Sequence, residues 1–290
     1  MTPVKINSSG LTLVELMVAL AVGSIVLTLI VGTYVTQQRA YVRQQLIVDM
    51  QQNARAAMAL MKGEIRMAGY NPAASDGIDN DLNLTIDDES ADTGFITAQA
   101  SSVRFTMDLY NLDNPSWATD GLDNDGDGAI DEWDERYDMA TDADNEDVGY
   151  SYVANRLLRG PDDLAYDIDA VAFAYAFDSE PDGQLDTSAN NFIVWAFDSD
   201  GNGDLDRAVD SNDDGLIDNS DAAGGSALAF PVSLDRIRAV RIWLLARTRH
   251  PVSGYFDNRT YVVGSQRFVS DDEYKRMLLS ARISCRNMGI

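Results

Sequence analysis

The sequence has almost no cysteine or histidine: Cys285 and His250 are the single examples among 290 residues. One cysteine cannot form an internal disulfide. One histidine, followed by a proline and without a nucleophile motif around it, gives no support for acid–base or nucleophilic catalysis. We therefore expect no enzymatic activity, a surface position for His250, and a buried, inert thiol at Cys285.

Basic residues are scarce in the middle of the chain. Positions 76–221 carry 39 of the 47 acidic residues but five of the 22 basic ones, and the formal net charge is −25. Nucleic-acid binding needs clustered Lys and Arg, so we expect no nucleic-acid partner. This segment repels itself unless cations neutralise it. With 45% hydrophobic residues, the chain can still bury a core.

Charge is absent from residues 16–36, LMVALAVGSIVLTLIVGTYVT, and this run of 21 residues is long enough to cross a membrane. A short polar leader, MTPVKINSSG, precedes the run, and the apolar pattern continues beyond it, unlike a secretory signal peptide. Glu15 lies at its edge, where burying a carboxylate costs about 2.5–3.5 kcal/mol. Such a group usually has a partner.

The apolar pattern continues as one stripe at steps of three and four residues, typical of a helix. The stripe consists of Ile47, Met50, Ala54, Met58, Met61, Ile65 and Ala68. Gly69 and Pro72 are stop signals after it. We expect one helix over 11–69 with a transmembrane part over about 16–36, followed by a β-rich head over 70–290.

The N-terminal residues SSG and LTLVELMVALAVG resemble the class III signal of type IV prepilins and type II secretion pseudopilins. The resemblance implies that a prepilin peptidase cuts after the 1–10 leader, at Gly10, and methylates Leu11, where the family prefers Phe. It also implies that Glu15 pairs with the free amine of a neighbouring subunit, because a buried carboxylate and ammonium are tolerated only as a pair. The alternative is a plain signal anchor with an incidental glutamate.

Five acidic segments share the spacing D-x-[DNE]-x-[DN]-G-x-[LI]-D or a near match, within expected insertions at about 76–92, 120–147 and 178–221. The candidate metal ligands are Asp123, Asp125, Asp127, Ala129, Asp131 and Asp134; Asp210, Asn212, Asp214, Leu216, Asp218 and Asp221; Asp198, Asp200, Asn202, Asp204 and Asp206; and Asp178, Glu180, Asp182 and Asp186. The weakest segment, Asp79 to Asp87, has Leu84 in place of the turn glycine. Segments 170–186 and 190–206 resemble each other, which suggests a duplicated strand-plus-loop unit.

The spacing suits calcium. Alternate residues of a tight loop turn their oxygens inward, a glycine permits the bend, and the seventh position offers its carbonyl, here that of Ala129 or Leu216. The loops resemble EF-hand and thrombospondin-type calcium repeats without long flanking helices. We expect several structural Ca²⁺ ions and no other cofactor. The alternative is a solvated acidic linker, since Asp and Gly are also common turn residues.

Strand-like runs favour an antiparallel sheet in the head, with the acidic loops as insertions at its edges. The runs are 103–107, 148–153, 156–159, 171–177, 192–197, 240–246 and 261–263, and VGYSYVANRLLRG reads as a hairpin. The fold class is thus α+β, and the resemblance implies a type IV pilin fold. The basic residues from Arg236 to Arg249 and from Arg276 to Arg286 are expected to pair either with acidic residues or with a neighbouring pilin.

The segment EIRMAGYNP, at 64–72, is similar to the end of the long helix in PilW-type minor pilins, and AVRIWLLARTR and LLSARISCRN are similar to their late strands. The resemblance implies a minor pilin in the bacterial inner membrane, single-pass with a periplasmic head, that reaches the pilus or cell surface on assembly. Its implied partners are major and minor pilins, the prepilin peptidase, the inner-membrane assembly platform and membrane lipid. A type II secretion pseudopilin and a calcium-dependent pilus-tip adhesin are the alternatives.

Overall fold

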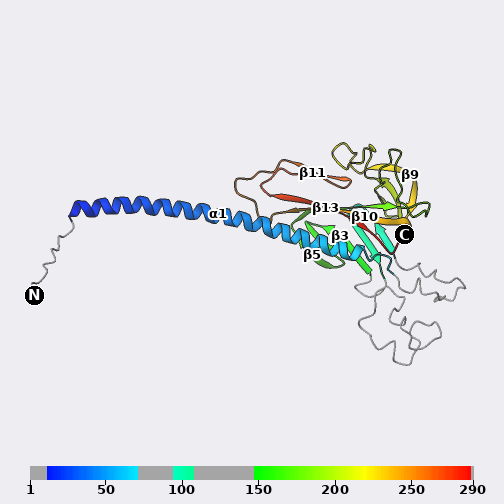
Figure 1. Cartoon of the computed structure of the whole chain (residues 1–290), viewed down its shortest axis with the longest axis horizontal. Helices are drawn as coiled ribbons and strands as arrows, with labels where there is room; N and C mark the ends of the chain where they lie inside the picture. Colours follow the sequence, from blue (N-terminus) through cyan, green and yellow to red (C-terminus); the bar gives the residue numbers. More distant parts are fainter. Residues whose placement is uncertain (1–11, 71–93, 108–146, 289–290) are drawn as a thin grey trace, which may run out of the picture. The chain divides into compact units, whose positions relative to one another are not determined.

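The computed structural model describes residues 12–70, 94–107 and 147–288 (Figure 1). The chain divides into two compact units, Met1–Val48 and Asp49–Ile290. A single helix, α1 (Leu13–Ile65), runs through the described part of the first unit and into the second. The expected long N-terminal helix is therefore confirmed.

In the first unit, the side chains of α1 from Leu13 to Arg39 are exposed, including large apolar ones such as Leu20 and Leu29, each 66% exposed. By length and composition, α1 can span a membrane. Its serine and threonine hydroxyls, from Ser24 to Thr36, donate hydrogen bonds within the helix. Ser24 and Thr28 each donate to a carbonyl oxygen three or four residues earlier, at 2.8 Å. A helix that satisfies its own polar groups is suited to a medium without water.

In the second unit, one face of α1 is buried, as the apolar stripe predicts. The buried side chains are Met50, Ala54, Ala57, Met58, Met61 and Ile65. The helix ends at Ile65, and a turn follows in which Gly69 has a φ of 72°. A Cβ on Gly69 would lie 2.4 Å from the sulfur of Met288, a flexible side chain that can move aside, so the positive φ is the main reason for glycine here.

The described strands of the second unit form three sheets in which all neighbouring strands pair antiparallel, so the α+β fold class is confirmed. The first sheet has the order β1 (Gly94–Ala98), β2 (Ser102–Thr106), β3 (Asp147–Val153), β4 (Arg156–Arg159), β5 (Asp162–Tyr166). The second has the order β13 (Arg276–Ser284), β10 (Ile237–Arg247), β6 (Ile168–Phe177), β7 (Ala196–Phe197), β8 (Asp204–Ala208), β9 (Ser226–Ser233). The third is the hairpin of β11 (Thr260–Val263) and β12 (Gln266–Val269).

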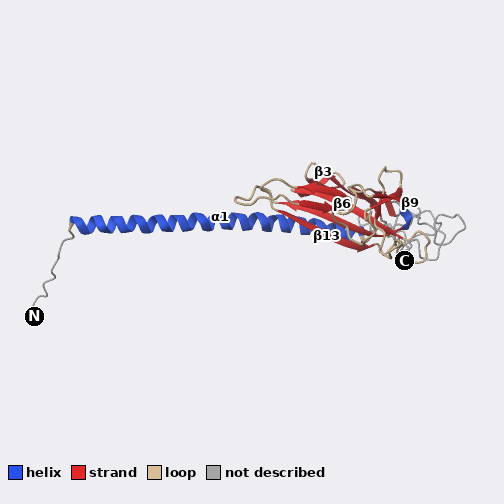
Figure 2. Cartoon of the chain, turned by 90° about the horizontal axis from the view of Figure 1, so that it is seen from above, coloured by secondary structure: helices blue, strands red, loops and turns tan. Residues whose placement is uncertain are grey.

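The core lies where the first two sheets and the last part of α1 meet. Every residue of β6 is buried. The ring of Tyr175 on β6 lies 5.8 Å from that of Phe95 on β1, and the amide of Phe173 donates to the carbonyl of Ala100 at 2.9 Å. The strands run beside the last turns of α1 (Figure 2). This packing anchors the helix end on a rigid platform.

One strand expected in the head is much shorter than predicted. The run 192–197 forms only the two-residue strand β7, because residues 188–192 close a tight turn in which the Ser188 amide donates to the Phe192 carbonyl at 2.8 Å. The described acidic loops join the strands at one end of the second sheet, and loop 210–221 leads from β8 to the terminal strand β9. Loop 178–186 leads from β6 toward β7, and loop 198–206 joins β7 to β8, so both connect neighbouring strands of one sheet.

The expected hairpin over 148–160 is present as β3 and β4. Its two turn residues, Ala154 and Asn155, have φ values of 49° and 65°. Positive φ at both central residues is the turn geometry that matches the twist of paired strands.

Candidate functional site

The processing positions Gly10 and Leu11 lie outside the described residues, and the description begins at Thr12. Thr12 and Glu15 satisfy each other at the start of α1. The amide and hydroxyl of Thr12 both donate to Oε2 of Glu15 at 2.9 Å, and the Glu15 amide donates to the Thr12 hydroxyl at 3.3 Å. This reciprocal pattern is a capping box. Its signal, Thr-x-x-Glu before an apolar run, was present in the sequence and was missed.

The capping box holds one oxygen of Glu15 and leaves the other available. Oε1 of Glu15 accepts no hydrogen bond from the described residues. The carboxylate thus has a local partner in Thr12, whereas the family resemblance implied only the amine of a neighbouring subunit. An oxygen fixed in direction at the first turn of an apolar helix is suited to receive one cationic group.

The end of α1 is fixed to the first sheet by a polar cluster. Arg159 of β4 donates from Nε to both carboxylate oxygens of Glu64, at 3.0 and 3.1 Å, and the hydroxyl of Tyr150 on β3 also donates to Glu64. Burial and the bond to Glu64 raise the pKa of Tyr150, so its hydroxyl stays a donor. Asn53 adds a bond to the Tyr166 carbonyl at 2.6 Å. The helix end is therefore held by directional bonds as well as by its apolar stripe.

Loops 178–186 and 198–206 have the same hydrogen-bond pattern, as the predicted duplication implies. The amide and hydroxyl of Ser199 donate to Oδ1 and Oδ2 of Asp206 at 2.8 and 2.7 Å. Ser179 makes the same pair of bonds to Asp186. In each loop the first aspartate, Asp178 or Asp198, accepts backbone amides from the turn ahead.

The turn glycines have the backbone conformation that their loops require. Gly183, Gly203 and Gly215 have φ values of 80°, 91° and 81°, which non-glycine residues rarely adopt. The glycine position of the motif is therefore explained in all three described loops.

Loop 210–221 closes differently from the other two. Its last aspartate, Asp221, accepts the amide of Ser211 at 2.7 Å and, through its other oxygen, the amide of Asp218 at 2.9 Å. Both oxygens of Asp210 accept backbone amides, from Asp213 and Gly215, at 2.8 Å. The loop is thus closed at its twelfth position rather than its ninth.

The oxygen-bearing side chains of the three described loops have the type and sequence order that calcium requires. In the structure, however, they are not grouped around a common point. Within 12–70, 94–107 and 147–288, no three His, Cys, Asp or Glu side chains are grouped to hold a metal ion. The carboxylates described above instead accept loop amides. The candidate ligands from Asp123 to Asp134, and the weak segment Asp79 to Asp87, lie outside the described residues.

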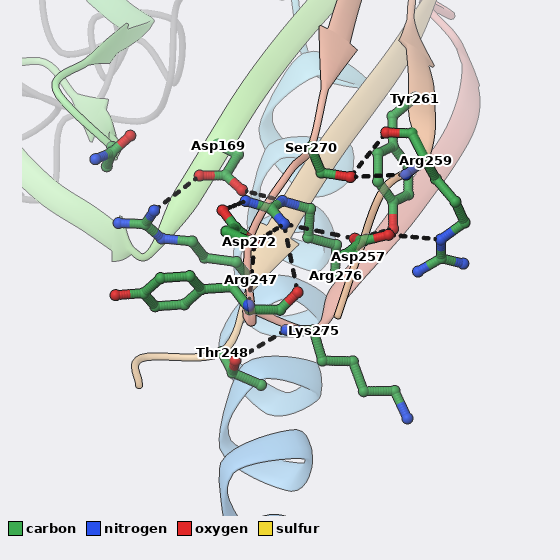
Figure 3. Close-up of polar contacts among 12 residues, drawn as sticks. Asp169, Arg247, Thr248, Asp257, Arg259, Tyr261, Ser270, Asp272, Lys275 and Arg276 are labelled. Carbon is green, nitrogen blue, oxygen red and sulfur yellow. Dashed lines mark hydrogen bonds and ion pairs between the residues drawn. The ribbon is translucent and has the colours of Figure 1, made fainter. Parts of the chain in front are cut away.

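A buried charge cluster, which we name the Arg276 cluster, lies between β6, β10, β13 and the β11–β12 hairpin (Figure 3). The guanidinium of Arg276 contacts Asp169 at 2.6 Å, both oxygens of Asp272 at 2.6 and 2.7 Å, and Asp257 at 3.5 Å. Arg247 contacts the other oxygen of Asp169 at 3.4 Å. Sequence reasoning left open whether these arginines pair within the chain, and the structure assigns both of them internal partners.

The pKa values of the carboxylates in the Arg276 cluster are shifted by burial and by their hydrogen bonds to arginine. Hydrogen bonds from Arg276 lower the pKa of Asp272, which lies at the rim. Burial raises the pKa of Asp169, and the bond from Arg276 offsets part of that rise. A bidentate arginine that balances several carboxylates is a structural clamp rather than a catalytic acid or base.

Two other residues lie as the sequence predicts. His250 is exposed. Cys285 is fully buried beyond the end of β13, and burial raises the pKa of its thiol to about 12. A thiol in this environment is unreactive at neutral pH.

Comparison with known proteins supports the reading of the N-terminus. Residues 5–31 match the family described as the prokaryotic N-terminal methylation motif. No match is found among curated proteins. Among solved structures, a type IV-like pilin from Thermus thermophilus is similar, with 12% identity and a TM-score of 0.36 over 83% of this chain and 98% of the other.

Proposed function

We propose that the chain is a type IV pilin-like filament subunit that is cleaved after Gly10 and incorporated through α1. The observation that carries this is the methylation motif over residues 5–31, which includes the first turns of a helix that can span a membrane. Glu15 would present Oε1 to the amine of a neighbouring subunit. A carboxylate and an ammonium that leave water together are tolerable because each neutralises the other.

Within this class we propose a PilW-type minor pilin that primes or caps the filament. Support comes from the residues at 64–72, which resemble the helix end of that group. The head would face the periplasm before assembly and the cell surface afterwards. Its partners would be other pilins, the prepilin peptidase and the inner-membrane assembly platform, and no enzymatic activity is proposed.

The test is to determine the N-terminus of the protein from its native membrane by mass spectrometry, with and without the prepilin peptidase. We expect a methylated Leu11 in the first case and an intact Met1 in the second. Met1 retained in both would refute the proposal. Deleting the gene then separates the alternatives, because a minor pilin affects piliation whereas a pseudopilin affects secretion.

We also propose that calcium binds loops 123–134, 198–206 and 210–221, and with fewer ligands loop 178–186. In loop 210–221 the ligands would be Asp210, Asn212, Asp214, Asp218, Asp221 and the Leu216 carbonyl. The charge supports this role, since 39 acidic side chains within positions 76–221 repel one another without cations. The ions would neutralise the loops and stabilise the folded state.

Thermal unfolding of the full chain in detergent tests the calcium proposal. Calcium at about 100 times its Kd adds roughly 2.7 kcal/mol, so the melting temperature should rise by several degrees relative to EGTA. Magnesium at the same concentration is the control. Asp214→Asn should reduce the rise, whereas Asp271→Asn, an exposed site outside the loops, should not. Equal melting curves in calcium and EGTA would refute calcium binding.

A further inference from the structure

Arg241 on β10 and Arg282 on β13 lie directly opposite each other in the paired strands. Neither side chain makes an ion pair or a hydrogen bond with another of the described residues. Arg241 is half-buried, and burial together with the charge of Arg282 lowers its pKa. Like charges directly opposite each other destabilise a sheet, so this arginine pair lacks a neutralising carboxylate.

The other end of the same two strands shows what such a carboxylate does. Arg247 and Arg276 are also directly opposite each other there. Asp169 of β6 contacts both guanidiniums, at 3.4 Å from Arg247 and 2.6 Å from Arg276. Beside Arg241, however, β6 places the uncharged Ala174. The chain thus neutralises one arginine pair internally and leaves the other without an acidic partner among the described residues.

Two tryptophan rings hold the unpaired guanidiniums in place. The guanidinium carbon of Arg241 lies 4.7 Å from the ring centroid of Trp243 and 5.9 Å from that of Trp195. The guanidinium carbon of Arg282 lies 5.5 Å from the same Trp195 ring, and both rings are buried. A guanidinium over an aromatic ring keeps its N–H groups available to a carboxylate. The two arginines are therefore preorganised to bind one acidic group.

The edge of β13 gives such a group a way to approach. β13 is the terminal strand of its sheet and pairs only with β10 among the described strands. The Cys285 amide donates to the Arg238 carbonyl at 2.9 Å, and bonded pairs alternate along antiparallel strands. Arg282 and Ser280, which are both exposed, therefore direct their backbone groups away from β10. A segment paired with this edge would place the Cβ of one residue about 4.5–5.5 Å from that of Arg282.

We propose that the free edge of β13 binds an extended segment of a partner protein, with an acidic side chain of that segment in contact with Arg282 and Arg241. The edge would supply main-chain hydrogen bonds, and the carboxylate would fix the register. The net charge of −25 repels a strongly acidic partner, so a segment with one Asp or Glu among uncharged residues fits best. No residue of α1 or of the candidate calcium loops takes part, so this site is independent of the pilus and calcium proposals.

The test measures binding of two blocked peptides to the full chain in detergent by titration calorimetry. The probes are acetyl-Thr-Val-Thr-Glu-Thr-Val-Thr-amide and the same peptide with glutamine in place of glutamate. We expect the glutamate peptide to bind at least tenfold more tightly, as is usual for a charged hydrogen bond. Arg282→Gln should remove most of this preference. It should leave binding of the glutamine peptide unchanged, because the strand edge remains.

Arg249→Gln is the matched control, because it removes the same charge from an exposed position outside this site. Its peptide binding should equal that of the natural chain. Arg282→Gln relieves the repulsion of Arg241, so its melting temperature should not fall. Three results would each overturn the inference: no binding of the glutamate peptide at millimolar concentration, an equal preference for glutamate in Arg282→Gln and Arg249→Gln, or acetyl-glutamate amide binding as tightly as the full peptide.

Discussion

Arg276 and Asp169 form an ion pair with Nε 2.6 Å from Oδ2, and their side chains are 1% and 3% exposed. The pair connects β13 to β6 across the intervening β10. Replacing Arg276 with Met would leave Asp169 buried without its main cation. Removing one partner of a buried pair typically costs about 3–5 kcal/mol. We expect a loss of that size in the free energy of unfolding, measured by urea titration.

An exposed pair provides the comparison. Arg156 and Asp163 lie 3.0 Å apart with side chains 44% and 25% exposed. Solvent screens such a pair, so Arg156→Met should cost about 0–1 kcal/mol. If the two variants lost equal stability, the Arg276 cluster would not be the clamp that its burial implies.

Glu64 should contribute most of the polar attachment between the end of α1 and the first sheet. Glu64→Ala leaves the Tyr150 hydroxyl and the Arg159 guanidinium without their shared acceptor, at a cost of about 1–3 kcal/mol. Proteolysis near the end of α1 should accelerate together with the loss of stability. Lys62→Ala, on the same turn of α1, should change stability by less than about 0.5 kcal/mol. An equally protected helix end in Glu64→Ala would show that the apolar stripe alone holds it.

Patterns that are local in the sequence predicted much of this structure. The buried stripe of α1, the β3–β4 hairpin and the positive φ of Gly183, Gly203 and Gly215 each follow from spacing over a few residues. Local spacing encodes these features because helix period, turn chemistry and loop closure are short-range properties.

Features that join distant residues were not predictable in the same way. Asp169 and Arg276 are separated by 107 positions, and nothing near either residue signals the other. The strands β5 and β8 carry aspartates that weaken any alternation, so their pairing depends on neighbouring strands.

Cys285 should make the fold sensitive to alkali. Burial raises the pKa of its thiol to about 12 from an ordinary value of 9.0. Above pH 9 the unfolded chain therefore loses this proton while the folded chain keeps it, so stability falls as pH rises toward 12. The slope approaches about 1.4 kcal/mol per pH unit for one proton.

Measuring the free energy of unfolding with urea at pH 8, 9 and 10 tests whether the Cys285 thiol causes this loss of stability. Cys285→Ala should show a shallower fall than the natural chain, because the tyrosines contribute equally to both. A thiol reagent should label the natural chain only as fast as it unfolds. Rapid labelling at pH 8 in the folded state, or identical slopes for the two chains, would contradict this assignment.

Thr12 should stabilise the first turn of α1 and, through its hydrogen bonds, hold the Glu15 carboxylate in one orientation. Thr12→Val removes the hydroxyl that donates to Oε2 and accepts the Glu15 amide, while the backbone bond from Thr12 remains possible. Loss of a helix cap costs about 1 kcal/mol, which corresponds to roughly fivefold faster hydrogen exchange at the Glu15 amide in detergent. Thr12→Ser keeps the hydroxyl and should exchange like the natural chain.

Thr28→Val is the control, since its hydroxyl bonds to the Ser24 carbonyl one turn earlier and is remote from Glu15. Cleavage after Gly10 should continue in Thr12→Val, because the change adds no charge and keeps the side-chain size. Incorporation into filaments should fall, since an Oε1 that is no longer fixed in direction must be ordered when the neighbouring amine arrives. Unchanged exchange at Glu15 would show that the capping box does not order this turn. Normal exchange with impaired incorporation would instead place the role of Thr12 in contacts between subunits.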